Sequence, residues 1–518
     1  MPGINDAQAA SFEIANPGAE ALIESLRAIG YSLPTAIADI IDNSIAASAS
    51  NVWLDFHWSG PDSWIAITDD GKGMTDEELS NAMRPGSTSP MDTRSPSDLG
   101  RFGLGLKTAS FSQCRVLSVI SKTTAGEKSR RCWNLDFVAK HNEWRLLLNA
   151  TPAAEEASKV LDSLDSGTLV MLENLDRVVG GASPKNDKAH EHFLGRINEL
   201  RKHLAMTFHR FIATPKPRLN IWINGKEEQH LVKAWDPFME DHKCTTRTPI
   251  DPVQFGSEIV NIRGFVLPHK DKLTEEEFDD GAGPRGWNSQ QGFYIYRNDR
   301  MLVSGSWLNL GPMRAWPKEE HYKLARLSID IPNSMDSEWS LDVKKSVAMP
   351  PQNIRHRLTK LAEDVRGRAR RVFVHRGEYG PRASGSDQEL ERPWTSTTRH
   401  GHTVYKISRR HPMITGVLNQ LGSLKPEVDA MLRFLEETVP VQKIWLDAAE
   451  KSQDNAAPYE GIPEEVLLAD LRRVWEMLLD SGITEDEARM RILSMEPFNR
   501  YADEISKLKK QANTTSNS

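Results

Sequence analysis

The sequence predicts an α/β protein with two to four domains, and three features of its 518 residues support this fold class. Apolar residues recur at three- and four-residue spacing in 19–30 and 34–47, which predicts two amphipathic helices. Segments rich in strand-forming residues follow at three places, 64–68, 291–298 and 324–331. The region 412–511 is again helical in pattern, and Pro463 opens one of its helices.

Composition narrows the class of protein. Hydrophobic residues make up 39% of the chain, enough for ordinary cores, and the net charge of −7 does not indicate a protein that coats nucleic acid over its whole surface. The three cysteines are never spaced as Cys-x-x-Cys, which argues for a reducing compartment and against structural zinc. The sequence has no apolar run of membrane-spanning length, and its first ten residues do not resemble a signal peptide. We therefore expect a cytoplasmic protein without a membrane partner.

The second predicted helix carries the first of three candidate ligand-binding motifs. Asp39 and Asn43 are four residues apart and share one helix face. Together they form an oxygen-rich patch that suits Mg²⁺, a cation that keeps several waters and bridges to phosphates. Asp39 is also a candidate for orienting water. A solvated polar face without a function is equally typical of this spacing.

The second motif follows the strand predicted at 64–68. Asp69 stands at the strand end as an acceptor for an exocyclic amine, and Gly71 and Gly73 allow the backbone to turn sharply. Beside Gly73, Met74 offers a soft apolar contact for a flat base. This combination suits adenine, although an ordinary Asp-Gly turn is the more common meaning of such a run taken alone.

The third motif is rich in glycine and leads into a helix. Gly100, Gly103, Leu104 and Gly105 precede Lys107, so backbone N–H groups, a helix N-terminus and a point charge are available to phosphate oxygens. The spacing matches neither a P-loop nor a Rossmann fingerprint. Three such motifs in this order within residues 39–107 predict an ATP site.

The three motifs resemble the N, G1 and G2 boxes of the GHKL ATPase superfamily, which includes gyrase B, MutL, the ninety-kilodalton heat-shock chaperone, histidine kinases and MORC proteins. The sequences of segments 38–47 and 100–110 are most similar to those of prokaryotic MORC-like proteins, and the resemblance covers roughly residues 15–375. It implies a two-layer GHKL (Bergerat) ATP-binding domain, a transducer-type α/β domain and a helical C-terminal region. It also implies ATP with Mg²⁺, and a role for Thr168 in water-mediated adenine recognition beside Asp69.

This sequence departs from the superfamily pattern at two positions. Asp39 stands where most hydrolysing members have Glu, one methylene longer, so we expect slow turnover rather than none. Ala46 stands where many relatives have Asp, which removes one ordered polar contact near the nucleotide.

The expected domain organisation follows the motifs and the linker composition. We expect an ATP-binding domain, a transducer-type domain, a linker and a helical region at 15–205, 206–376, 377–411 and 412–518. Residues 80–99 are predicted to form a mobile lid on the first domain, with a plain surface loop as the alternative. Residues 219–238 resemble two strands around an Asn-Gly turn that open the second domain, and 268–290 is predicted to be a charged insertion or loop.

Positive charge later in the chain suggests further roles. Lys344 or Lys345 occupies the position where transducers of this superfamily present a lysine to the terminal phosphate, although a solvated turn also explains a lysine pair. The arginine-rich helix predicted at 353–376 could contact DNA, face solvent or dock an acidic partner. The helices of 412–511 carry no recognisable chemistry, so we interpret them as a region for binding a protein partner or for coupling.

Taken with the resemblance, these features predict a slowly hydrolysing, MORC-like ATPase that closes or forms a homodimer when ATP binds. Its expected role is DNA-related, for example in restriction or anti-phage defence. Two alternatives remain open, a heat-shock-type chaperone and a MutL-like DNA repair clamp. Client protection without DNA dependence would indicate the chaperone, and a C-terminal dimerisation domain would indicate the clamp.

Overall fold

The computed structural model describes residues 17–28, 30–86, 105–213, 215–255, 258–335, 338–340, 348–374, 393–399, 402–441, 443–444, 459, 462–495, 497–498 and 501–508. The chain divides into two compact units, Met1–Tyr379 and Gly380–Ser518.

The first unit begins with a six-stranded sheet in the order β4-β3-β5-β2-β1-β6. Neighbouring strands are antiparallel, except that β1 and β6 are parallel. The strands are β1 (Asn51–His57), β2 (Trp64–Asp69), β3 (Val116–Lys122), β4 (Lys128–Asn134), β5 (Gly167–Glu173) and β6 (Asn220–Ile223). The central strand β2 is buried along almost its whole length, because both faces of the sheet are covered there.

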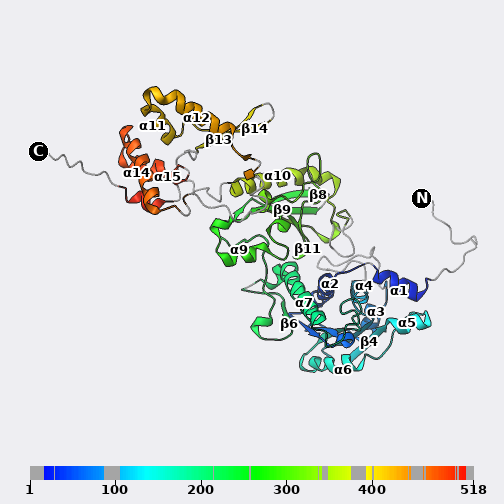
Figure 1. The fold of residues 1–518 in the computed structure, drawn as a ribbon. Helices are drawn as coiled ribbons and strands as arrows, with labels where there is room; N and C mark the ends of the chain where they lie inside the picture. Colours follow the sequence, from blue (N-terminus) through cyan, green and yellow to red (C-terminus); the bar gives the residue numbers. More distant parts are fainter. Residues whose placement is uncertain are drawn as a thin grey trace, which may run out of the picture. The chain divides into compact units, whose positions relative to one another are not determined.

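Helices cover one face of this sheet (Figure 1). They include α1 (Ala19–Arg27), α2 (Leu33–Ala46), α4 (Gly105–Phe111), α5 (Leu135–His141) and α7 (Asp187–Thr207). Ile37 and Ile41 of α2 pack with Leu54 and Ile67 of the sheet in one large apolar core. On the other face, a smaller cluster packs against α6 (Pro152–Ala157) and the 3₁₀ helix Ser158–Ser163.

Local signals in the sequence determine where two of the helices begin. The Ser32 side chain accepts a hydrogen bond from the Thr35 N–H at the start of α2, and Pro34 lies in the first turn. Helix α3 (Asp76–Met83) starts with a capping box between Thr75 and Glu78. The expected helices at 19–30 and 34–47 therefore form, with bounds that differ by only a few residues.

A second sheet follows in the same unit, in the order β11-β10-β12-β9-β7, with β8 also paired to β9. Its strands are β7 (Thr246–Arg247), β8 (Asp251–Phe255), β9 (Glu258–Val266), β10 (Gly292–Arg297), β11 (Arg300–Ser306) and β12 (Ala325–Asp330). Helix α10 (Gln352–Val374) buries Leu358, Ala362 and Val365 in the core of this sheet. The predicted α/β fold class is confirmed, with a two-layer first domain, a second α/β domain and a helical C-terminal region.

Two short helices lie between the two sheets in the sequence or within the second α/β domain. Helix α8 (His209–Ile212) follows α7 and contacts the second sheet through His209 and Arg210. Helix α9 (Glu275–Ala282) forms within 268–290, where we expected a charged insertion or loop. A capping box between Thr274 and Glu277 starts this helix. The pattern Thr-x-x-Glu could have predicted it, but the many charged residues of the segment favoured the interpretation as a loop.

Strand β6 lies outside the domain to which the sequence analysis assigns it. The analysis places 206–376 in the second domain, whereas β6 pairs with β1 of the first sheet. Asn224 and Gly225 do adopt positive φ values, of 55° and 154°, as an Asn-Gly turn requires. The expected second strand is reduced to one bridge, between Trp222 and Leu231.

The second unit contains a hairpin and a set of helices. The hairpin joins β13 (Trp394–Arg399) to β14 (His402–Ile407) within the predicted linker 377–411, because its Thr, Val, Tyr and Ile residues favour strands. The helices are α11 (Pro412–Gln420), α12 (Lys425–Glu437), α14 (Glu464–Asp480), α15 (Glu485–Leu493) and α16 (Ala502–Ser506). Helices α14, α15 and α16 share one apolar core, which includes Trp475, Ile492 and Phe498. None of the helices in the described ranges is both long enough and apolar enough to cross a membrane.

Candidate functional site

Asp69 ends the buried strand β2 and lies at the centre of the candidate site. It is paired across the sheet with Thr168 of β5 and is only 5% exposed. Its Oδ2 accepts a hydrogen bond from Ser44 Oγ at 2.8 Å, and its Oδ1 accepts one from the Gly71 N–H at 2.9 Å. Burial raises the pKa of the Asp69 carboxyl above its usual range, although these hydrogen bonds oppose the shift. Each carboxylate oxygen has two lone pairs, so the group can also accept from an amine.

The loop after Asp69 packs too closely for larger residues. Gly73 has a φ of +69°, and a Cβ there would lie 2.0 Å from the Lys122 carbonyl oxygen of β3. A Cβ at Gly71 would lie 2.7 Å from the Ala47 side chain, just beyond the end of α2. Both glycines are therefore required by the close approach of this backbone to its neighbours.

Hydroxyl groups connect this loop to β3 and β5. The Met74 N–H donates to Ser121 Oγ at 2.8 Å, and Ser121 Oγ lies 2.8 Å from Thr168 Oγ1. Ser166 Oγ donates to the Gly71 carbonyl at 2.8 Å. Met74, Thr168 and Asp69, which the sequence proposes as adenine contacts, thus lie in one hydrogen-bonded region. The sequence analysis did not identify Ser121 or Ser166, which carry no motif of their own.

On helix α2, the two residues of the first motif differ in exposure. Asp39 is 4% exposed, whereas Asn43 is exposed and donates from its side chain to the Asp39 carbonyl at 3.2 Å. The Tyr31 hydroxyl donates to Asp39 Oδ2 at 3.1 Å. Asp39 is therefore held in a fixed orientation, and Asn43 remains accessible to a ligand.

Arg300 of the second sheet also contacts Asp39. Its Nη2 lies 3.3 Å from Asp39 Oδ1 and its Nε lies 3.2 Å from Asp42 Oδ1. All three side chains are at most 4% exposed, so this ion-pair cluster is buried between the two α/β domains. The sequence analysis did not identify Tyr31, Asp42 and Arg300 as site residues, because none of them stands at a motif position to which a role was assigned.

Lys107 is buried on α4, at 3% exposure. Its Nζ donates to the Ala82 carbonyl oxygen, at 2.9 Å, near the end of α3. Burial lowers the pKa of Lys107 to about 8. Among the described residues, no atom from elsewhere in the chain lies within 4 Å of the place that a Cβ of Gly105, the first residue of α4, would occupy.

Five predicted site residues lie outside the described residues, namely Gly100, Gly103, Leu104, Lys344 and Lys345. Most of the predicted lid, 87–99, also lies outside them, while residues 80–83 form the end of α3.

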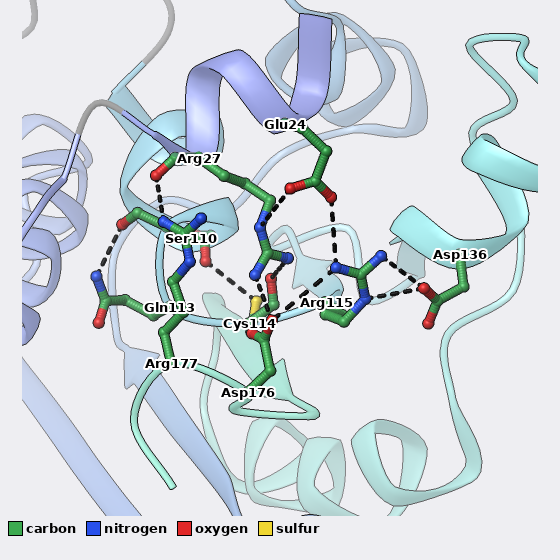
Figure 2. Close-up of polar contacts among 10 residues, drawn as sticks. Glu24, Arg27, Ser110, Gln113, Cys114, Arg115, Asp136, Asp176 and Arg177 are labelled. Carbon is green, nitrogen blue, oxygen red and sulfur yellow. Dashed lines mark hydrogen bonds and ion pairs between the residues drawn. The ribbon is translucent and has the colours of Figure 1, made fainter. Parts of the chain in front are cut away.

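A second polar network joins α1 to α5 and to the residues that follow α4 and β5 (Figure 2). Arg27 of α1 is 1% exposed and donates to Asp176 Oδ2 at 2.5 Å and to the Cys114 carbonyl at 3.2 Å. Arg115 reaches Asp136 at 2.6 Å beside this pair. Gln113, next to Cys114 in the chain, donates to the Tyr31 carbonyl at 3.0 Å, and the Tyr31 hydroxyl is the group that hydrogen-bonds Asp39.

Part of the chain is similar in sequence to known ATPases. Residues 31–168 match a family model described as histidine kinase-, DNA gyrase B-, and HSP90-like ATPase. The chain is also similar to ATPase morc-1 of Caenorhabditis elegans, with 24% identity over 242 residues, which cover 37% of this chain and 27% of the relative. The matched region is thus a small part of that relative, and it supports a distant similarity only.

Proposed function

The chain carries an ATPase domain of the GHKL superfamily with MORC-like similarity at low identity, and from this premise we propose that it binds and slowly hydrolyses ATP to drive closure or homodimerisation. The observation that carries the proposal is the buried Asp69 carboxylate, held by Ser44 and Gly71 at the end of β2. A buried acceptor in a fixed orientation suits recognition of one exocyclic amine.

In this proposal the motifs surround one nucleotide. Asp69, Gly71, Gly73, Met74 and Thr168 would hold adenine, and Gly100, Gly103, Leu104, Gly105 and Lys107 would hold the phosphates. Asn43, which is exposed on α2, would contact Mg²⁺ bound to ATP. ATP supplies the phosphoanhydride bond to be hydrolysed, and Lys344 or Lys345 would stabilise charge at its terminal phosphate.

Asp39 is the proposed general base, and the short reach of its side chain supports slow turnover. It is shorter than the Glu of most hydrolysing relatives, and Arg300 lies 3.3 Å from its Oδ1. The guanidinium holds one carboxylate oxygen in place and so fixes the direction from which the base can approach a water molecule. We expect Asp39→Ala to retain ATP binding and lose turnover, and a parental rate in this variant would assign water activation to another residue.

A DNA-related role, plausibly in restriction or anti-phage defence, is the proposed output. On α10, Arg366 is buried against Trp307, Trp316 and Tyr322, and Arg357 pairs with Asp251 at 2.6 Å. The Arg368 side chain is 43% exposed but pairs with Asp364 at 3.0 Å, and the other exposed cations of this helix are Lys360, Arg370 and Arg371. The proposed DNA-binding surface on α10 is therefore smaller than the number of arginines in its sequence suggests. A protein partner is proposed separately, at the C-terminal helices.

The decisive experiment measures ATP hydrolysis and oligomeric state together. Steady-state turnover is measured with and without double-stranded DNA, and sizing is performed without nucleotide, with ADP and with a non-hydrolysable ATP analogue. We expect DNA to change the rate and the analogue to favour a dimer more than ADP does. No ATP binding by calorimetry would overturn the ATPase proposal. Identical sizing in all three states would overturn nucleotide-driven dimerisation.

A further inference from the structure

Arg300 is placed to connect the second α/β domain with the proposed catalytic carboxylate. It opens β11, and each of its three guanidinium nitrogens has an acceptor. Nε donates to Asp42, Nη2 donates to Asp39, and Nη1 donates to the Met301 carbonyl at 2.9 Å. The last bond ties the guanidinium to the backbone of β11, so its position follows the position of the second domain.

The joint between the two domains does not depend on this arginine alone. Met206 at the end of α7 packs in a buried apolar cluster with Phe238, Tyr294 and Tyr296. Arg210 of α8 forms an ion pair with Asp330 of β12, and its guanidinium lies 3.6 Å from the centre of the Tyr296 ring. These contacts hold the domains together at a place that does not include Asp39. Loss of Arg300 should therefore leave the joint largely intact.

We propose that Arg300 is a positioning residue through which the second domain controls ATP hydrolysis at Asp39, and this inference rests on the proposed function. The guanidinium fixes the Asp39 carboxylate from one side, and the Tyr31 hydroxyl fixes it from the other. It also adds positive charge between two buried carboxylates that are one helical turn apart. A displacement of the second domain would withdraw this support and reorient the base.

Binding and turnover should separate when Arg300 is changed. Adenine recognition is proposed at Asp69, which Arg300 does not contact, so ATP affinity should be retained. Hydrolysis needs the base within a fraction of an ångström of its working position. We expect Arg300→Met to lower kcat roughly ten- to a hundred-fold and to change KM and the calorimetric Kd for ATP by less than about three-fold.

Two further variants make the test specific. Arg300→Lys keeps the charge but cannot donate to two carboxylates from one planar group, so its kcat should fall between those of Arg300→Met and the parent. It also carries the test if Arg300→Met does not fold, as judged by circular dichroism. Arg210→Met removes a matched ion pair from the same joint without touching Asp39, and it should leave kcat within about three-fold of the parental value.

Each outcome decides between explanations. Parental kcat in folded Arg300→Met or Arg300→Lys would overturn the inference, and so would an equal loss in Arg210→Met, which would indicate loosening of the joint. An equal loss of ATP affinity and of kcat would also overturn it. If the parental protein itself fails to bind ATP, the proposed function fails, and that result is separate because it is measured before any variant is made.

Discussion

Replacing Asp69 with Asn should abolish most ATP affinity without unfolding the protein. The amide oxygen can still accept from the Gly71 N–H, and Ser44 Oγ can rotate to accept from the new NH₂ group, so the side chain keeps its orientation. The amide would then present N–H where adenine also presents N–H. Because residue 69 is only 5% exposed, water cannot readily replace the lost hydrogen bond. An unpaired buried group costs about 1–3 kcal/mol, which corresponds to a Kd about 5- to 150-fold higher.

The assay is isothermal titration calorimetry with ATP at pH 7.5, together with thermal unfolding of each variant. Asp70→Asn is the matched control, because Asp70 Oδ1 accepts from the Ser50 and Asn51 N–H groups at 2.7 and 2.8 Å and so has a structural role. We expect Asp70→Asn to lower stability and to leave ATP affinity near the parental value. A parental Kd in Asp69→Asn, or the same loss in both variants, would refute the assignment of adenine recognition to Asp69.

Three further predictions follow from buried groups near the site. Arg27→Met should lower the free energy of unfolding by about 2–3 kcal/mol in urea titrations, because it leaves Asp176 without its main partner. This value is smaller than the cost of breaking a fully buried ion pair, because Asp176 is 33% exposed. A loss of less than about 0.5 kcal/mol would contradict the prediction. Gly73→Ala should lower the free energy of unfolding by about 2 kcal/mol or more, since the new Cβ would lie 2.0 Å from a backbone oxygen. Gly180 has a similar φ of +63°, but the nearest neighbour of its added Cβ would be 3.9 Å away, so Gly180→Ala should lower stability less. Equal losses of stability in thermal unfolding would show that the positive φ alone determines the effect. Because burial lowers the pKa of Lys107 to about 8, ATP affinity measured by calorimetry should weaken as the pH rises through 8. The contribution of Lys107 to stability should increase between pH 8 and about 10.5, because the unfolded chain binds more protons than the folded one in that range. Lys107→Met should remove the pH dependence of ATP affinity, and if that dependence persists, Lys107 is not its cause.

The first domain is well predicted because its information is local. Helix α2 was expected at 34–47 and forms at Leu33–Ala46, since both its apolar spacing and its N-terminal Ser-Leu-Pro are sequence signals. The run at 64–68 predicted β2 for the same reason, and the Asp69 position followed directly from the strand end. The roles of these residues in binding remain predictions.

The contacts around Asp39 could not be predicted because they are not local. Asp39 and Arg300 are 261 positions apart, and only the packing of two domains brings them together. Spacing placed Asp39 and Asn43 on one helix face, but it could not show that the second sheet covers the first and leaves the second exposed. Strand β6 was assigned to the wrong sheet for a similar reason, because an edge strand carries no sequence mark of its partner.

The pairing of β1 with β6 affects how the protein is made on the ribosome. Asn51 and Asn220 lie side by side in the finished sheet but are 169 positions apart, so β1 is synthesised long before the strand that completes its edge. During that interval the edge of β1 presents unpaired backbone groups that another nascent chain could use. A polypeptide that ends at residue 205 would keep this edge open permanently, and we expect it to aggregate during expression although it contains all of residues 31–168.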